Sequence, residues 1–182
     1  MTPFYTAKGD SGDTGFLGEG RISKASVRIE AVGSVDEATA AIGLARALSV
    51  DEKTRAILLH VQKQLYFLMS ELSADPDTAH HFDKINDEAL GWLELQIAEL
   101  EKVVTLPREF IIPGETAASG ALSVARAIVR RAERRTVALL DANEIEKPIL
   151  VAYLNRLSSL LFILEVLEAS FSVQGIRLAK ED

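Results

Sequence analysis

The chain has 182 residues, of which 48% are hydrophobic and 26% charged, the ordinary balance of a single globular domain. Its net charge of −7 argues against sequence-independent nucleic-acid binding, which requires a basic surface. The absence of cysteine excludes disulfides, thiolate metal sites and cysteine nucleophiles.

The first part of the chain, residues 1–33, is rich in glycine and lacks a helical period, which predicts an irregular loop. Its stretch TAKGDSGDTG, residues 6–15, combines close glycines with hydroxyls at Thr6 and Thr14 and a cation at Lys8. Glycines allow backbone N–H groups to approach a phosphate closely. The stretch matches neither a Walker A loop nor a dinucleotide fingerprint, so alone it favours a flexible arm over a phosphate site.

Five segments with apolar residues at intervals of three and four follow the loop, and each predicts a helix. We expect these helices over residues 34–49, 52–73, 84–103, 117–141 and 147–170. Ser34 and Glu37 have the spacing of a capping box, so the first helix is expected to begin there. The fifth helix is apolar almost all round, which is typical of the central helix of a bundle.

Five helices with short connections predict an all-α fold, a five-helix antiparallel bundle preceded by a Gly-rich N-terminal loop. We expect one domain over residues 1–182, consisting of the loop 1–33, the bundle 34–171 and a C-terminal tail 172–182. The polar start differs from a secretory signal, and charges interrupt the most apolar run, so we expect a cytoplasmic protein that binds no membrane and no nucleic acid.

The expected fourth helix carries charges on a face that is otherwise apolar. At about 100° per residue, Arg130 and Glu133 lie within about 40° of Arg126, so the three share one face. Burying a charge without a partner is costly. Three interpretations remain open: an ion pair between Arg130 and Glu133, a contact between subunits, or a site for polyphosphate, which a guanidinium matches well. This helix alone favours the two structural interpretations.

Other residues allow a structural role or a ligand role. Lys24 and Arg28 would be solvated surface cations or would add charge to an anion site. Asp36 would oppose the dipole of its helix or pair with an arginine of the charged face. Asn155 would bond to neighbouring backbone or contact a ligand, and Phe110 would fill the core. The three histidines lack the spacing of metal ligands, so no metal site made of protein side chains is expected.

Five stretches occur together in one order: YTAKGDSGDTGFLGEGRISK, RIEAVGSVDEATAAIGLARA, FIIPG, SVARAIVRRAER and YLNRLSSLLF. From Tyr5 to Phe162 the chain resembles the PduO-type ATP:cob(I)alamin adenosyltransferases, a family of corrinoid adenosyltransferases. The resemblance implies a ferritin-like homotrimer of five-helix bundles with active sites between adjacent subunits. It also implies transfer of the 5′-deoxyadenosyl group of ATP to the cobalt of cob(I)alamin, with release of triphosphate.

The resemblance also implies roles for the charged face. Arg126 would form an intersubunit salt bridge with Asp36 of the partner subunit. Arg130 would contact the polyphosphate of ATP, and Glu133 would belong to the same ATP site.

The remaining implied roles concern the nucleotide, the corrinoid and the loop. Asn155 would contact the nucleotide, and Phe110 would press on the corrin face and displace the lower axial ligand. The N-terminal loop would wrap the triphosphate, with Mg²⁺ assisting, through Thr6, Lys8, Gly9, Gly12, Thr14 and Lys24.

In this reaction cob(I)alamin is itself the nucleophile, so the protein has to position ATP and stabilise the departing triphosphate. A corrinoid reductase and a B12-dependent mutase are further partners that the resemblance suggests. Two alternatives are a non-catalytic carrier or sensor of ATP and corrinoid, and a purely structural trimer. The chain departs from the family pattern at Ala7, Val32, Ser123 and Ser159, which bears on corrinoid contacts more than on the reaction.

Overall fold

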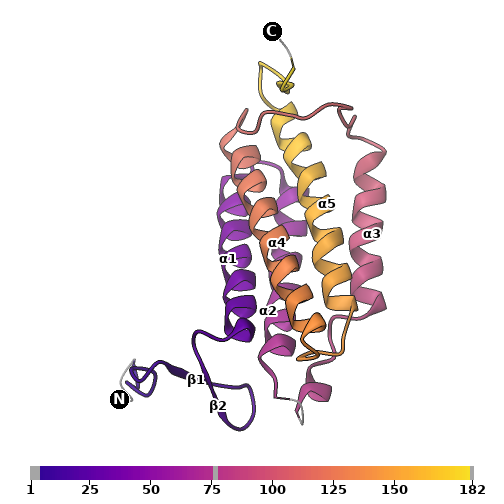
Figure 1. Cartoon of the computed structure of the whole chain (residues 1–182). Helices are drawn as coiled ribbons and strands as arrows, with labels where there is room; N and C mark the ends of the chain where they lie inside the picture. Colours follow the sequence, from indigo (N-terminus) through magenta and orange to yellow (C-terminus); the bar gives the residue numbers. More distant parts are fainter. Residues whose placement is uncertain (1–4, 76–77, 181–182) are drawn as a thin grey trace.

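The structure, a computed structural model, describes residues 5–75 and 78–180, and these ranges form five long helices (Figure 1). The helices are α1 (Val27–Leu48), α2 (Glu52–Ser73), α3 (Asp87–Glu101), α4 (Ala117–Asp141) and α5 (Ile149–Ser170). A short 3-10 helix, η1 (Ala79–Phe82), lies between α2 and α3, and an antiparallel hairpin of β1 (Asp13–Gly15) and β2 (Arg21–Ser23) precedes α1. The expected five-helix bundle is confirmed, and the hairpin is an addition to it.

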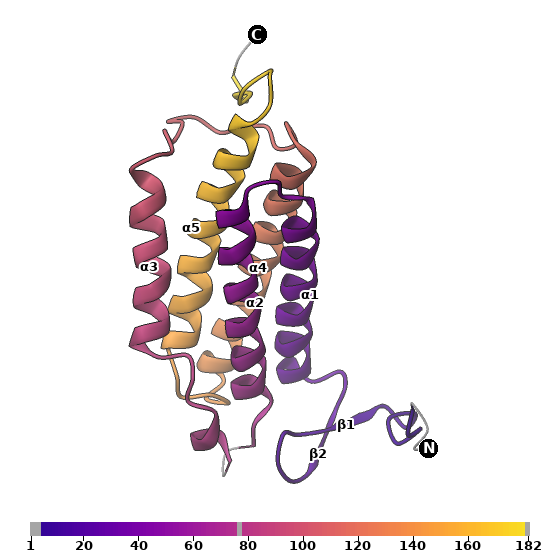
Figure 2. The same cartoon turned by 180° about the vertical axis from the view of Figure 1, so that it is seen from behind.

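The helices pack in the order α2, α1, α4, α5, α3. Neighbours along this order are antiparallel except α3 and α5, which run in the same direction (Figures 1 and 2). The exception arises because residues 102–116 cross the end of the bundle before α4 begins. At the opposite end, the hairpin projects beyond the start of α1 (Figure 2).

Helix α1 begins earlier than expected. Its N-cap is Ser26, whose hydroxyl accepts a hydrogen bond from the backbone N–H of Ile29. The expected start at Ser34 is wrong: Ser34 is buried inside the helix and donates its hydroxyl to the Glu30 carbonyl at 2.9 Å. A serine can be satisfied in this way within a helix, so the capping-box spacing alone did not identify the true start.

Helix α5 is the central helix, as expected from its apolar surface. Most of its residues are buried, and it packs between α3 and α4. Within the described ranges it is also the one helix with the length and composition of a membrane span, but its burial is that of a core helix. The exposed residues of α5 therefore lie between its contacts with α3 and its contacts with α4.

The tip of the hairpin is anchored on the C-terminal end of α2. The backbone N–H of Leu17 donates to the Ser73 carbonyl at 2.8 Å, and that of Glu19 donates to the Asp75 carboxylate at 2.8 Å. Gly18 between them has φ +137°, and a Cβ at this position would overlap the Asp75 carboxylate. The anchor therefore requires glycine at position 18.

We expect Gly18→Ala to lower the free energy of unfolding by about 1–3 kcal/mol, because the substitution adds both backbone strain and a clash with Asp75. Urea denaturation would measure the loss. Gly91→Ala is the matched control, since Gly91 lies on the exposed face of α3 with no neighbour near its added methyl group. Equal stability of the Gly18→Ala and wild-type proteins would show that the anchor contributes nothing.

Candidate functional site

An open cavity of about 490 Å³ lies where α3, α4 and α5 meet. One part of its wall is apolar, and another part carries three arginines and two serines. Its lining residues are Ile97, Glu101, Leu106, Arg126, Arg130, Arg156, Ser158, Ser159, Phe162 and Ile163. The cavity thus offers an apolar surface beside concentrated positive charge, a combination suited to a large ligand with an anionic part.

Arg130 is the least neutralised of these cations. It is exposed, and it forms no ion pair or hydrogen bond with any residue of the described ranges. The ion pair with Glu133, one of the three interpretations, is therefore not formed, and Glu133 instead accepts a hydrogen bond from the Asn155 amide at 2.9 Å. Of the three interpretations of the charged face, the subunit contact and the polyphosphate site remain.

The Asn155 side chain joins α4 to the rim of the cavity. Its amide nitrogen donates a hydrogen bond to Glu133, and its amide oxygen accepts one from Arg156 at 2.9 Å. Arg156 in turn pairs with Glu94 of α3 at 3.1 Å. These contacts link Glu133 to Asn155 and Asn155 to Arg156, and Arg156 lines the cavity together with Arg130.

Two other arginines of α4 face α1. Arg131 pairs with Glu37, and Arg135 pairs with Glu30 at 3.3 Å. The arginines of the charge-rich sequence RRAERR therefore differ in their surroundings. Arg131 and Arg135 tie α4 to α1 at the surface, and Arg130 points to the cavity.

Glu165 of α5 lies behind the cavity wall, although in the sequence it stands out only as a charge that interrupts an apolar run. Its side chain is 1% exposed, and its Oε2 lies 3.4 Å from Arg126 Nε. Burial raises the pKa of Glu165, while the Ser123 hydroxyl and the Arg126 charge lower it and offset part of this rise. An acidic residue three positions after Phe162, on the same face of the helix, was the available signal in the sequence.

Glu168, one turn further along α5, is buried away from this cavity. Its carboxylate accepts a hydrogen bond from the Ser49 hydroxyl. Burial raises the pKa of Glu168 above the ordinary value of 4.5, and the charge of Asp51 acts in the same direction, while the Ser49 hydroxyl opposes them. The folded protein therefore favours the neutral form of this carboxyl group.

This pKa shift gives a pH-dependent expectation for Glu168→Gln. A carboxyl group with a raised folded-state pKa contributes stability at low pH and loses it as pH rises through that pKa. The neutral glutamine does not titrate, so the Tm of Glu168→Gln should rise relative to wild type as the pH increases above about 4.5. Differential scanning calorimetry of both proteins from acidic to neutral pH measures this, and a Tm difference independent of pH would contradict it.

The N-terminal loop is compact. Lys24 closes it by donating Nζ to the Gly9 carbonyl at 2.7 Å and its backbone N–H to the Gly12 carbonyl at 2.9 Å. Gly12 has φ +89°, a conformation that favours glycine, and Thr14 pairs with Ile22 in the hairpin. Gly9, Gly12 and Lys24 therefore lie together, whereas Thr6 and Lys8 lie exposed on the same loop.

Phe110 lies at the other end of the bundle, in the connection between α3 and α4. The expectation that it fills the core is wrong, because Phe110 is 87% exposed. Its backbone carbonyl accepts from the Ala179 N–H at 2.7 Å, and Ile112 N–H donates to Arg177 O at 2.9 Å. The expected tail 172–182 thus pairs, through its described part, with the connection that presents Phe110.

The structure brings some expected site residues together and leaves others apart. Arg126, Arg130, Glu133 and Asn155 lie at or beside the cavity. The glycine-rich loop and the connection between α3 and α4, which carries Phe110, lie at opposite ends of the bundle (Figure 1). Asp36 is exposed on α1 and forms no ion pair with the described residues, so Arg126 does not meet it within one chain.

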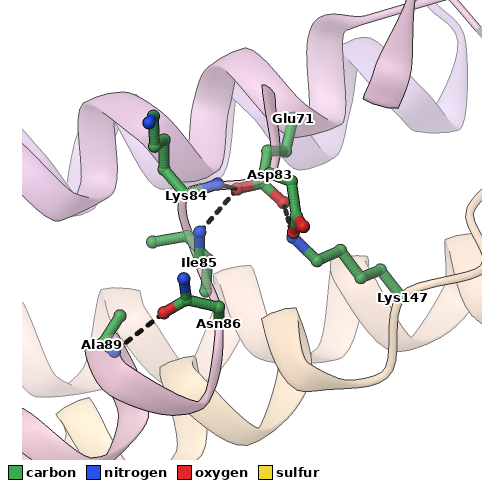
Figure 3. Close-up of polar contacts among 7 residues, drawn as sticks. All are labelled: Glu71, Asp83, Lys84, Ile85, Asn86, Ala89 and Lys147. Carbon is green, nitrogen blue, oxygen red and sulfur yellow. Dashed lines mark hydrogen bonds and ion pairs between the residues drawn. The ribbon is translucent and has the colours of Figure 1, made fainter. Parts of the chain in front are cut away.

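A second cavity, of about 450 Å³, lies near the hairpin end of the bundle, and most of its charged side chains are paired with one another. Lys147 pairs with Glu71 and Asp83, and Glu71 also accepts from the backbone N–H groups of Lys84 and Ile85 (Figure 3). Lys147 lowers the pKa of Asp83, as expected for a carboxylate with a cationic partner. This cluster joins α2 to the segments before α3 and α5, so the first cavity is the candidate site.

Arg28 lies at the same end of the bundle, and the structure shows a role for it other than the two expected. Its side chain is buried and donates to the carbonyls of Leu72 and Ala74 at 3.2 and 3.3 Å, and it pairs with Glu144 at 3.2 Å. Arg28 is therefore neither a solvated cation nor part of the loop's charge. It fastens α1 to the end of α2 and to the connection between α4 and α5.

Comparisons with known proteins agree on one family. The family model for cobalamin adenosyltransferase matches residues 4–168. A corrinoid adenosyltransferase of Bacillus subtilis is 39% identical over 162 residues, covering 87% of this chain and 82% of the relative. The corrinoid adenosyltransferase PduO of Salmonella typhimurium is 37% identical over 173 residues, 94% of this chain, which spans about half (51%) of that relative's length.

A solved structure has the same architecture. It is a variant of a PduO-type ATP:corrinoid adenosyltransferase from Lactobacillus reuteri, complexed with cobalamin and ATP. The two superpose with a TM-score of 0.85 at 29% sequence identity, covering 98% of this chain and 97% of the solved one.

Proposed function

The chain belongs to the cobalamin adenosyltransferase family, and from that membership we propose that it transfers the 5′-deoxyadenosyl group of ATP to the cobalt of cob(I)alamin. The observation that carries the proposal is Arg130, an unpaired guanidinium at the rim of a cavity with an apolar wall. Such a site accommodates a polyphosphate beside a large, mostly apolar ring. Carrier and sensor functions remain outcomes of the test below.

In the proposed reaction the electron pair of Co(I) attacks C5′ of the ribose, a Co–C bond forms, and the C5′–O bond to triphosphate breaks. The protein supplies no nucleophile. Arg130 stabilises the negative charge that develops on triphosphate, and Lys24 adds charge from the loop. Glu133 and Asn155, already hydrogen-bonded to each other, orient the nucleoside part.

The glycine-rich loop would hold the triphosphate through backbone N–H groups and hydroxyls. Its members in this role are Thr6, Lys8, Gly9, Gly12, Thr14 and Lys24. The described ranges contain no group of three histidine, aspartate or glutamate side chains placed to hold a metal ion. We propose that Mg²⁺ arrives with ATP, because its phosphate oxygens supply ligands of the kind this ion prefers.

We propose that the active site is completed between subunits of a homotrimer. The glycine-rich loop and the connection between α3 and α4, which carries Phe110, lie at opposite ends of one chain, so a neighbouring copy would bring them to one site. Asp36, exposed on α1, would then pair with Arg126 of the partner subunit, and Phe110 would press on the corrin ring. A cytoplasmic location, and exchange of corrinoid with a reductase and a B12-dependent mutase, belong to the same proposal.

An anaerobic assay tests the proposed function. Chemically reduced cob(I)alamin, Mg²⁺ and ATP are mixed with the protein, and the Co(I) spectrum is followed. Enzyme-dependent conversion to adenosylcobalamin with equimolar triphosphate supports the transferase. ATP binding in calorimetry without conversion would favour a carrier or sensor instead, and light scattering of the same sample tests the trimer.

A further inference from the structure

Glu165 is a buried charge for which the proposed reaction has no direct use. Its side chain is 1% exposed, and in the described part of the chain neither carboxylate oxygen has a hydrogen bond of normal geometry. The Ser123 hydroxyl is near enough only to lower the pKa of Glu165 in part. Among the residues that the structure describes, its charged neighbour is Arg126, whose Nε lies 3.4 Å away and is likewise buried with no hydrogen bond of normal geometry to them. A carboxylate buried in this way is costly, so its presence calls for a reason other than packing.

The position of Arg126 suggests that reason. Its guanidinium carbon lies 5.6 Å from the centre of the Phe162 ring, and its Nε faces Glu165. Phe162 and Glu165 are three residues apart on α5, so one face of this helix holds the guanidinium on two sides. The side chain of Arg126 is 33% exposed and lines the cavity, and its terminal nitrogens have no hydrogen bond to the described residues.

We propose that Glu165 is a positioning residue, which fixes Arg126 through Nε so that the terminal N–H groups face an anionic oxygen entering the cavity. This inference rests on the proposed function, since the anion is either the triphosphate of ATP or a carboxylate of a second copy of this chain. Glu165 itself touches neither. Its attraction orients a flexible cation before the ligand arrives, which lowers the cost of ordering Arg126 on binding.

Glu165→Gln separates this role from a structural one. The substitution keeps the shape and removes the charge, and Arg126, being partly exposed, remains solvated. We therefore expect an unchanged or higher Tm together with kcat/KM for ATP about tenfold below wild type. A raised KM for ATP at constant oligomeric state identifies triphosphate as the anion, and dissociation in light scattering at low protein concentration identifies the second copy.

Glu168→Gln is the matched control. Glu168 is also a buried glutamate of α5 with a raised pKa, but its partner is Ser49 and it does not line the cavity. Its substitution should leave kcat/KM at the wild-type value. A loss of activity in both variants would point to a general effect of neutralising α5, and would overturn the proposal.

A double-mutant cycle with Arg126→Met completes the test. If Glu165 acts through Arg126, Glu165→Gln should cause no further loss of kcat/KM in the Arg126→Met protein. Wild-type kcat/KM in Glu165→Gln, a multiplicative loss in the double variant, or a loss of activity accompanied by a lower Tm would each overturn the positioning role alone. A wild-type protein without transferase activity would overturn the proposed function as well.

Discussion

Arg130→Ala is expected to lower kcat/KM for ATP by about a hundredfold or more, the usual effect of removing a group that stabilises charge in the transition state. The departing triphosphate gains negative charge as the C5′–O bond breaks, and Arg130 is the cavity cation that no described residue neutralises. Because Arg130 is exposed and unpaired, its removal leaves no buried partner behind. Activity should therefore fall while the Tm and the oligomeric state stay at their wild-type values.

Arg134→Ala is the matched control for this substitution. Arg134 lies one turn further along α4, is also exposed and does not line the cavity, so the same change in net charge should leave kcat/KM unaltered. Arg130→Lys should recover only part of the activity, since an ammonium group lacks the planar fork of a guanidinium. Wild-type kinetics in Arg130→Ala would remove Arg130 from the site.

The helices were predictable because their signals are local. Apolar residues at intervals of three and four gave α2 and α4 with the bounds that the structure shows, and the apolar surface of α5 gave its central place. The start of α1 was missed because a serine followed by a glutamate three residues later occurs within a helix as well as at its cap. The hairpin was missed because its two strands have only three residues each.

The site was predictable only in part. The shared face of Arg126, Arg130 and Glu133 follows from helical geometry, which is enough to define the three interpretations of that face. The partners of these residues could not be derived, because Asn155 and Glu165 come from another helix and no periodic pattern relates them to α4. Family resemblance, rather than spacing, supplied the roles of the loop and of Phe110, and these roles stay proposals.

The contacts of Arg28, like those of Arg126 and Glu133, could not be predicted from the sequence. Among the substitutions considered, we expect that of Arg28 to have the largest effect on stability. One side chain ties together residues that lie 44 and 116 positions apart in sequence. Arg28→Met keeps the apolar stem and removes every donor, leaving the carbonyls of Leu72 and Ala74 without this partner. We expect a loss of about 2–4 kcal/mol in the free energy of unfolding, because hydrogen bonds of a buried charged group are costly to leave unmade.

Urea denaturation measures this loss, and Arg55→Met is the control. Arg55 also forms an ion pair, with Glu52 at 2.9 Å, but both side chains are exposed, so its loss should cost at most about 0.5 kcal/mol. Arg28 does not line the cavity, so at temperatures where Arg28→Met is folded its KM for ATP should match wild type. Equal stability of the two variants would mean that Arg28 contributes no more than a surface charge, and that the end of the bundle is held by Lys147 and its partners instead.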